Sequence, residues 1–354
     1  MIDTQQPPVL SICIPTLNRS RYLLQALLSI DSQLIPERSL EVCISDNASD
    51  DDFTCVHDFV QNRAYIRVIR QPTRLDIDTN MYKTWSMASG HYIFFLGDDD
   101  YFLDQSLYHL YNIIDRYSPE VTILSGNCVS SSGRTISRLF HEVDTLDTSF
   151  ISAYKRHASH CMFGALMVKN SLFTHDLFRR FFGTSHAYMC FWASLATMPP
   201  ISDSSLCIYT PKNPIVALRT SSKTYSSQFL EIMYLGMPLW YQILLSFCSD
   251  TQSRRVIMDS ANSNYRLIYS PIFLSKLRLS GLNISQLVHY PPASACLYLT
   301  LNIFLVRSIP YSALVFIKSA YAKLLQSRIF LESLFAPFAL KRTSRLLSAF
   351  HHNR

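Results

Sequence analysis

The chain has 354 residues, of which 48% are apolar and 16% are charged, and its formal net charge is +6. This length allows two domains, or one large domain with an appendage, and the composition is that of a globular protein. Only eight residues are glycine, and neither GxGxxG nor GxxxxGK[ST] occurs, which argues against Rossmann dehydrogenases and P-loop kinases. The nine cysteines include no CxxC pair, so we expect mostly buried thiols in a reducing cytosol.

The positive charge is concentrated at the C-terminal end. Residues 307–354 contain eight Lys or Arg and a single acid, Glu332, which gives +7, so 6 − 7 = −1 remains for residues 1–306. We therefore expect an anionic surface to be bound by this tail, and we expect no nucleic-acid partner. The N-terminal residues MIDTQQPPV have no basic or apolar region, so we expect no signal peptide.

The most informative stretch is HYIFFLGDDDYFL, residues 91–103. Its apolar run Tyr92–Leu96 is short and bounded by glycines, which is typical of a strand buried on both faces, as in a parallel sheet. Three carboxylates, Asp98, Asp99 and Asp100, follow directly. Because like charges repel, a fold tolerates them mainly when a cation or a donor network lies among them, and such oxygen ligands suit Mg²⁺ or Mn²⁺. The alternative is a solvated acidic turn that caps the following helix.

Strand and helix patterns alternate over the first third of the chain. Short apolar runs predict strands at Val9–Ile14 (ended by Pro15), Leu40–Ile44, Ile66–Ile69, Tyr92–Leu96 and Val121–Leu124. Helices are predicted after a cap at Asn18 or Ser20, up to Asp58–Asn62, and over Asn80–Ala88. This alternation favours a parallel sheet with its site at the carboxyl ends of the strands, where Asp46 and Asp98–Asp100 lie.

Three motifs agree in order and spacing with a known family. The segments LSICIPTLNRSRYL, EVCISDNASDD and GHYIFFLGDDDYF resemble the nucleotide-binding half of family-2 glycosyltransferases with the GT-A fold. The resemblance covers roughly the first 115 residues. The first two motifs are further similar to bacterial enzymes that build O-antigen or other surface glycans, including abequosyltransferase-like members.

The resemblance implies roles for particular residues. Pro15 and Thr16 would line the nucleobase pocket with backbone groups, and Asp46 would accept a hydrogen bond from the base. Asp98 and Asp100 would be the outer carboxylates of a DxD motif. Asp98 would lie toward the ribose and the metal, and Asp100 would bind the metal. The cofactor would be a divalent metal ion, Mn²⁺ or Mg²⁺, that neutralises the diphosphate leaving group.

Two further positions match the family less directly. Asn80 matches a recurrent asparagine before the DxD strand and is assigned to the donor site. Arg74 stands where the family often has asparagine, so a contact with the donor phosphate and a solvated surface arginine are both open for it.

The catalytic base departs from the family pattern. Family members commonly carry Asp or Glu downstream of the DxD motif, but no carboxylate occurs between Asp176 and Asp203 here. The ionisable candidate in that window is His186, because an imidazole titrates near neutrality and can take a proton from a sugar hydroxyl. A structural or acceptor-binding histidine is the alternative, and Asp176 and Asp203 remain in reserve.

The later segments carry weaker signals. We expect a turn at Ser130–Arg134, a loop at Arg138–Thr148 and an acceptor-side strand in Cys161–Val168. Ile215–Ser227 combines a strand end with a basic loop whose Arg219 or Lys223 could reach the phosphates, with a surface loop without function as the alternative. Gly164 in the acceptor-side strand would admit an acceptor sugar or be a plain strand glycine. Glu231–Cys248 and Cys296–Val306 are too short or too interrupted for a confident membrane span, and we interpret Glu231–Cys248 as a buried helix.

The basic tail also shows a helical pattern. Apolar residues recur at helical spacing among its lysines, at Leu314, Ile317, Tyr321, Leu324 and Leu325. A cationic amphipathic segment of this kind is typical of a membrane-surface element, with a helical bundle packed on the catalytic domain as the alternative.

We therefore expect an α/β chain with a mainly parallel GT-A sheet and a helical C-terminal extension. Residues 1–115 would form the nucleotide-sugar-binding half, 116–228 the acceptor-binding half, and 229–354 a basic helical region. The resemblance implies an inverting, metal-dependent glycosyltransferase that moves a sugar from a nucleotide-sugar to a glycan hydroxyl. The acceptor would be lipid-linked, and the enzyme peripheral at the cytoplasmic face of a bacterial plasma membrane. A nucleotidyltransferase, whose usual Gly-rich basic loop is missing, and a degenerate nucleotide- or glycan-binding module are the alternatives.

Overall fold

The computed structural model describes residues 7–123, 125–129, 135–139, 143–157, 163–198, 206–219, 231–268, 270, 274–275, 278 and 296–314. Internal packing divides the chain into two units, Met1–Tyr265 and Arg266–Arg354.

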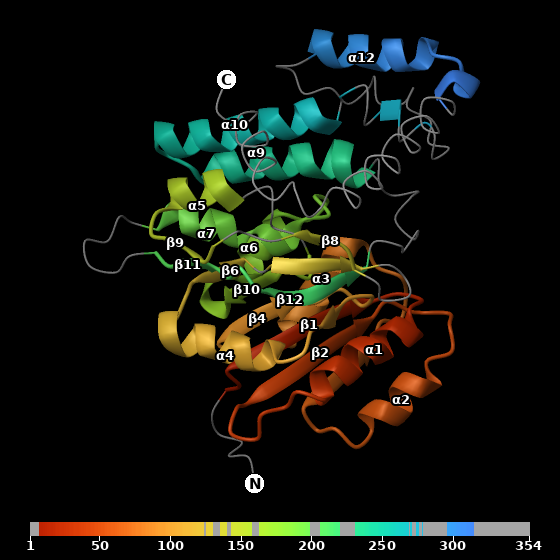
Figure 1. Cartoon of the computed structure of the whole chain (residues 1–354), viewed down its shortest axis with the longest axis vertical. Helices are drawn as coiled ribbons and strands as arrows, with labels where there is room; N and C mark the ends of the chain where they lie inside the picture. The colour runs from red at the N-terminus through yellow and green to blue at the C-terminus, as the bar shows by residue number, and fades with distance from the viewer. Residues whose placement is uncertain are drawn as a thin grey trace, which may run out of the picture. The chain divides into compact units, whose positions relative to one another are not determined.

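The first unit is built on an eight-stranded sheet in the order β3-β2-β1-β4-β10-β6-β11-β9 (Figure 1). Strands β3, β2, β1 and β4 run parallel to one another, while β10 runs antiparallel to both β4 and β6. The predicted α/β class and the predicted parallel arrangement of the first four strands of the larger sheet are confirmed. The strands are β1 Leu10–Thr16, β2 Leu40–Asp46, β3 Ile66–Arg70, β4 Tyr92–Phe95, β6 Val121–Ile123, β9 Thr145–Asp147, β10 Leu166–Lys169 and β11 Ile208–Thr210.

A second sheet of four strands has the order β5-β12-β7-β8. It pairs the residues directly after the acidic loop with a much later segment, because Phe102 in β5 lies opposite Val216 in β12. The loop predicted over Arg138–Thr148 is wrong in part, since this range holds the end of β8 and all of β9. The predicted turn at Ser130–Arg134 lies outside the described residues. The strands are β5 Tyr101–Phe102, β7 Ser125–Val129, β8 Thr135–Leu139 and β12 Pro214–Arg219.

Helices cover both faces of the larger sheet. On one face, Leu10, Ile12 and Ile14 of β1 share an apolar core with Leu27 of α1 and Leu110 of α4. Complete burial of each such side chain contributes roughly 1.5–3 kcal/mol. Helix α3 packs against β1 and β2. The helices that the structure describes in the first unit are α1 Ser20–Asp31, α2 Thr54–Val60, α3 Ile77–Ser86, α4 Ser106–Tyr117, α5 Phe150–His157, α6 His175–Arg180, α7 Phe191–Thr197 and α9 Met237–Phe247. Helix α10, Thr251–Ile268, begins in the first unit, and α12, Cys296–Ser308, belongs to the second.

The ends of two elements differ from the prediction. Strand β1 does not end at Pro15 but continues to Thr16. Since β4 accompanies β1 only as far as Cys13, the proline interrupts no ladder on that side. The predicted cap at Asn18 or Ser20 is also wrong. The backbone N–H at the start of α1, on Ser20, donates to Oδ2 of Asp51 at 2.8 Å, so the cap comes from a distant loop.

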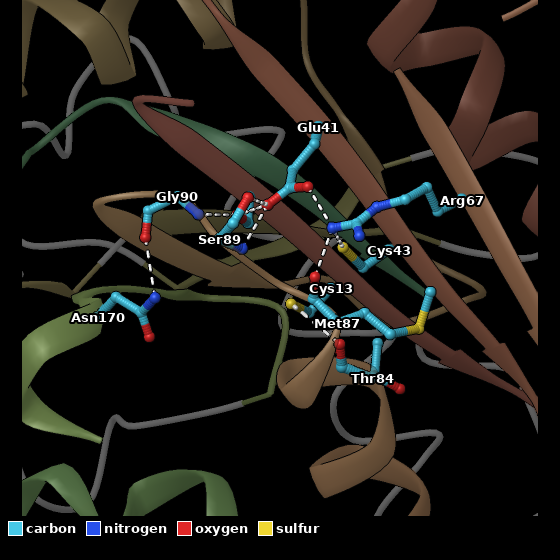
Figure 2. A network of polar contacts seen from close by, with 10 residues as sticks. Cys13, Glu41, Cys43, Arg67, Thr84, Met87, Ser89, Gly90 and Asn170 are labelled. Atoms are coloured by element: carbon cyan, nitrogen blue, oxygen red, sulfur yellow. Dashed lines mark hydrogen bonds and ion pairs between the residues drawn. The ribbon is translucent and has the colours of Figure 1, made fainter. Parts of the chain in front are cut away.

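A polar network closes the opposite edge of the sheet, at the amino ends of the strands (Figure 2). Glu41 at the start of β2 accepts hydrogen bonds from Oγ of Ser11 at 2.6 Å and from the backbone N–H of Ser89 at 2.6 Å. It also forms an ion pair with Arg67 of β3, and Arg67 donates to the carbonyl oxygen of Met87. These contacts join three strands to the loop before β4, which helps to hold the register that aligns the carboxyl ends.

The predicted helix within Glu231–Cys248 is present as a π-helical turn, Ile232–Gly236, followed by α9. It is only partly buried, because Leu235 and Leu239 are 42% and 38% exposed. In the second unit, α12 covers Cys296–Ser308 and so includes the apolar stretch Cys296–Val306. The tail pattern beyond Leu314 lies outside the described residues. Among the helices that the structure describes, none is long and apolar enough to cross a membrane.

Candidate active site

Three strand ends bring polar residues to one edge of the large sheet. Thr16 is the last residue of β1, Asp46 is the last residue of β2, and Asp98 follows β4 by three positions. Oγ1 of Thr16 donates to Oδ2 of Asp98 at 2.9 Å. The carbonyl oxygen of Thr16 accepts the N–H of Asn47 at 2.9 Å, which holds the end of β2 beside β1. The acidic residues predicted for this edge are therefore close neighbours there.

The buried carboxylate of Asp46 is held from two sides. Its Oδ1 accepts the N–H of Ser49 at 3.0 Å, and its Oδ2 lies 3.2 Å from Nη1 of Arg70. The side chain is therefore oriented before any ligand binds. Because the guanidinium of Arg70 is half exposed, a ligand donor can compete with it for the Asp46 carboxylate.

A buried arginine that the sequence argument did not single out neutralises part of the acidic loop. Nη1 of Arg19 lies 2.7 Å from Oδ1 of Asp98 and 3.2 Å from Oδ2 of Asp99. Burial raises the pKa of Asp98, and the Arg19 guanidinium acts against that rise. The loop is thus not a solvated acidic turn, since all three aspartates are buried. The only signal in the sequence was an arginine in the first motif, and an isolated arginine does not reveal its partner.

Asp100 is held in a different way from its neighbours. Its Oδ1 accepts the backbone N–H of Arg219 at 3.0 Å, and the Arg219 side chain donates to the carbonyl oxygen of Asp99. Burial and the nearby Asp99 raise the pKa of Asp100 to about 8. A Cβ atom on Gly97 or Gly164 would lie 2.5 or 2.6 Å from Oδ2 of Asp100, so both glycines leave room for this carboxylate. The close approach at Gly164 is therefore to Asp100.

His186 lies in the loop before the 3₁₀ turn Ala187–Met189 and is half-buried. Its Nδ1 lies 2.7 Å from the carbonyl oxygen of Thr184. A carbonyl oxygen can only accept, so Nδ1 carries the proton and Nε2 keeps a free lone pair. Burial lowers the pKa of His186, which keeps the ring neutral near pH 7. The ring of Tyr188 packs against Phe95, the last residue of β4, with centroids 6.2 Å apart, so the loop lies beside the end of that strand.

Residues 11–176 match the family model described as "Glycosyl transferase family 2". This part of the chain is therefore similar to family-2 glycosyltransferase domains. It contains β1 to β4, the acidic loop and β10. His186 follows it by ten residues, and the second sheet's β12 also comes later in the chain.

Two curated relatives match parts of the chain. Abequosyltransferase RfbV of Salmonella typhimurium is 37% identical over 109 residues, which is 30% of this chain and 33% of that protein. The GalNAc(5)-diNAcBac-PP-undecaprenol beta-1,3-glucosyltransferase of Campylobacter jejuni is 30% identical over 135 residues, which is 38% of this chain and 42% of that protein. The matches thus span between a third and about two fifths of the relatives' lengths.

Solved structures share the fold over most of the chain. TarS residues 1–349 from S. aureus aligns with a TM-score of 0.54 and 13% identity over 84% of this chain and 89% of TarS. The mannosyltransferase PcManGT from Pyrobaculum calidifontis aligns with a TM-score of 0.50 and 13% identity over 91% of this chain and 88% of that one. At these identities the likeness establishes the GT-A fold.

The remaining family-derived positions have different surroundings. Oδ1 of Asn80 accepts from Oγ of Ser45 at 2.7 Å, so this buried side chain holds the residue before Asp46. Arg74 is half exposed and pairs with the exposed Asp50. Among the reserve bases, Asp176 is an exposed residue in the first turn of α6, and Asp203 lies outside the described residues. Lys223 also lies outside them.

The carboxylates of the acidic loop fit a divalent cation. Asp98 and Asp100 offer the hard oxygen ligands that Mg²⁺ and Mn²⁺ prefer, and the raised pKa of Asp100 shows a charge that its surroundings compensate poorly. Within the described ranges, no three carboxylate, imidazole or thiol groups converge as a ready-made metal site. Mg²⁺ is commonly bound by one or two carboxylates together with substrate phosphates, which this edge could provide once a nucleotide is bound.

Proposed function

We propose that the protein transfers a sugar from a nucleotide-sugar to a hydroxyl group of a glycan in the synthesis of a bacterial surface polysaccharide such as O-antigen. The match of residues 11–176 to the family-2 domain supports this reaction. A lipid-linked acceptor is supported by one relative, whose name includes a glycan on a polyprenyl diphosphate.

The observation that carries the proposal is the convergence of Asp46, Asp98 and Asp100 at the carboxyl ends of parallel strands, where α/β sheets bind ligands. In this proposal, Asp46 accepts a hydrogen bond from the nucleobase, next to backbone groups of Pro15 and Thr16. Asp98 faces the ribose and, with Asp100, would hold Mn²⁺ or Mg²⁺, which when bound neutralises the charge of the nucleoside diphosphate.

In this proposal Asn80 and Arg74 both belong to the donor site, but they have different roles. Asn80 acts from behind Asp46 by holding Ser45. Arg74 reaches a donor phosphate only if its guanidinium exchanges Asp50 for that phosphate, which is feasible because both partners of this ion pair are exposed.

We assign the base role to His186. Nε2 would take the proton of the acceptor hydroxyl while the oxygen of that hydroxyl forms a bond to the anomeric carbon of the donor sugar. The bond from that carbon to the diphosphate oxygen breaks with its electron pair, and the configuration inverts. The hydrogen bond from Nδ1 to Thr184 supports this assignment, because it presents an unprotonated Nε2 at neutral pH.

The proposed location is the cytoplasmic face of the plasma membrane, where a lipid-linked acceptor would be available. The +7 charge of residues 307–354 supports attachment to an anionic surface. Phe304 and Leu305, which directly precede this segment on α12, are each more than half exposed and could add apolar contacts.

The test measures release of nucleoside diphosphate from UDP-, GDP-, CDP- and dTDP-sugars with Mn²⁺. We expect slow hydrolysis of one donor class, its loss in excess EDTA, and its abolition by Asp100→Ala. Asp104→Ala, at an exposed acid four positions on, is the matched control and should keep full activity.

Other outcomes would contradict parts of the proposal. Full activity in EDTA would refute the metal role. Donor binding without turnover would favour a degenerate binding module, and pyrophosphate release from a nucleoside triphosphate and a sugar phosphate would indicate a nucleotidyltransferase.

A further inference from the structure

Asp78 in the first turn of α3 is buried against the loop that carries His186. Only 1% of this residue is exposed. Its Oδ2 accepts the backbone N–H of Ser185 at 2.7 Å, and its Oδ1 accepts the backbone N–H of Ala187 at 3.0 Å. One carboxylate therefore binds the residues immediately before and after His186.

The loop that Asp78 holds is tightly wound. Ser185 has φ of +59°, a left-handed conformation that is unfavourable for a residue with a side chain. The N–H of His186 donates to Oγ1 of Thr184 at 3.0 Å, and Oγ1 in turn donates to the carbonyl oxygen of Phe181 at 2.7 Å. With these bonds made, the carbonyl oxygen of Thr184 is placed to accept the Nδ1 proton of His186.

A glycine supports the same carbonyl group from the other side. Gly236, at the end of the π-helical turn before α9, lies so close that a Cβ atom there would overlap the carbonyl oxygen of Thr184. Thr184 is thus confined between its bonds within the loop and the backbone of Gly236. The orientation of its carbonyl group, and with it the tautomer of His186, depends on both contacts.

We propose that Asp78 is a positioning residue for His186, whose two hydrogen bonds hold the 184–187 loop so that Nδ1 is protonated and Nε2 is free. The inference rests on the proposed role of His186 as the base. A carboxylate suits this task because both of its oxygens accept, whereas an asparagine would turn an N–H₂ group toward one of the two backbone N–H donors.

The same helical turn also reaches the donor side of the sheet. Asn80, two residues after Asp78, holds Ser45 next to Asp46. The first turn of α3 therefore links the end of β2 to the His186 loop. Burial raises the pKa of Asp78 to about 6, although the two hydrogen bonds from backbone N–H groups act in the opposite direction. Keeping this carboxylate charged in the interior therefore lowers the stability of the fold. Two ionisable groups interact electrostatically with Asp78. Asp76 on the same helix raises the pKa of Asp78, and Asp78 in turn contributes to the raised pKa of Cys190 at the start of α7.

The experiment compares Asp78→Asn with Asp76→Asn as the matched control. Asp76 caps the same helix turn through the N–H of Thr79 and is exposed, so its change perturbs α3 without touching the His186 loop. The donor that wild-type protein hydrolyses fastest serves as the probe. We expect Asp78→Asn to lower kcat about 10- to 100-fold with the donor KM within about 2-fold. Asp76→Asn should keep the wild-type kcat.

Two further readouts separate positioning from a purely structural role. In ¹⁵N-histidine spectra, the His186 signal, assigned by its loss in His186→Ala, should report the Nδ1-protonated tautomer in wild type and a mixture in Asp78→Asn. The double variant Asp78→Asn/His186→Ala should have the same kcat as His186→Ala alone, because residues that act through one group are not additive.

The outcomes test the positioning role of Asp78 separately from the base role of His186. An unchanged tautomer and kcat in Asp78→Asn, or multiplicative losses in the double variant, would overturn the positioning role. An unchanged kcat in His186→Ala would refute the base role itself. Should Asp78→Asn not fold, Asp78→Glu decides by the same readouts. It keeps both acceptor oxygens but moves them by one methylene, and a wild-type tautomer and kcat in that variant would also overturn the inference.

Discussion

Glu41 offers a sharp test of how this sheet is stabilised at the edge opposite the candidate site. The carboxylate is buried at the start of β2, accepts from Ser11 and twice from Ser89, and pairs with Arg67 (Figure 2). Glu41→Gln keeps the size and one acceptor oxygen but removes the charge. It also turns an N–H₂ group toward the guanidinium of Arg67, where donor would face donor.

The expected loss follows from these contacts. Hydrogen bonds to a charged group are each worth about 1.5–3 kcal/mol, against about 1 kcal/mol for neutral ones. The three bonds from Ser11 and Ser89 therefore weaken without breaking. The pair with Arg67 adds at most about 1 kcal/mol, because that guanidinium is 49% exposed and screened by solvent. We expect the free energy of unfolding to fall by about 2–4 kcal/mol, which for a chain of this size corresponds to roughly 3–7 °C in Tm.

Thermal unfolding across pH measures this loss. Although burial by itself raises the pKa of Glu41, bonds from Ser11 and Ser89 together with Arg67 lower the pKa below its usual value. A depressed pKa means that the stabilisation is present above the unfolded value, near 4.5, and disappears as pH falls through the folded value. The gap in Tm between wild type and Glu41→Gln should therefore be constant near neutrality and shrink in acid.

The matched control is Glu37→Gln, at an exposed acid in the loop before β2, which should leave Tm within about 1 °C because surface changes usually stay within ±0.5 kcal/mol. Neither variant should alter kcat, since both positions lie away from the carboxyl ends of the strands. A gap that widens in acid, or a Glu41→Gln protein as stable as Glu37→Gln, would refute this account of the network.

Three other changes test the site and the tail. His186→Ala should lower kcat by about 10²- to 10⁴-fold and remove the acidic limb of the pH–rate profile, which should lie below 6.5 because burial lowers the pKa of His186; a loss in acceptor KM alone would indicate acceptor binding. Arg19→Met should lower the free energy of unfolding, measured in urea, by about 3–5 kcal/mol, because Asp98 and Asp99 lose their buried cation. An unchanged urea midpoint would contradict the ion pairs of Arg19 with these two aspartates. Removing residues 309–354 should abolish sedimentation with anionic vesicles and spare nucleotide binding, because each basic residue near the membrane surface contributes about 1 kcal/mol of attraction. If the shortened protein unfolds instead, the tail is part of the folded core.

The strand positions within residues 1–115 could be predicted because buried strands appear as short apolar runs. Tyr92–Leu96 is the clearest case, since β4 occupies four of these five positions and all four are buried. The errors lie where an element depends on distant partners. The N-terminus of α1 is capped by Asp51, 31 residues later, and no local pattern could reveal that bond.

The position of the candidate site could be predicted from the expected order of strands and helices. The charged and hydrogen-bonding partners of its aspartates could not. Parallel strands put their carboxyl ends on one edge, so Asp46 and Asp98 could be expected together. The pairing of Arg19 with Asp98 joins residues 79 positions apart, and the bond from Arg219 to Asp100 joins residues 119 apart. Such contacts depend on how loops close over the sheet, which hydrophobic periodicity does not determine.

Asp76 and Asp78 show this limit most directly. Both are acids at the start of α3, where a negative charge is favourable because of the helix dipole, and sequence alone gives them the same explanation. In the structure Asp76 is exposed and caps the helix, while Asp78 is buried and binds another loop. A carboxyl placed only to stabilise a helix start would remain solvated, as Asp76 does. Burial that raises a carboxyl pKa, to about 6 at Asp78 and about 8 at Asp100, opposes stability. Retaining both groups at this cost argues for roles beyond folding: Asp78 through its two bonds to the His186 loop, and Asp100 as the proposed ligand of a cation.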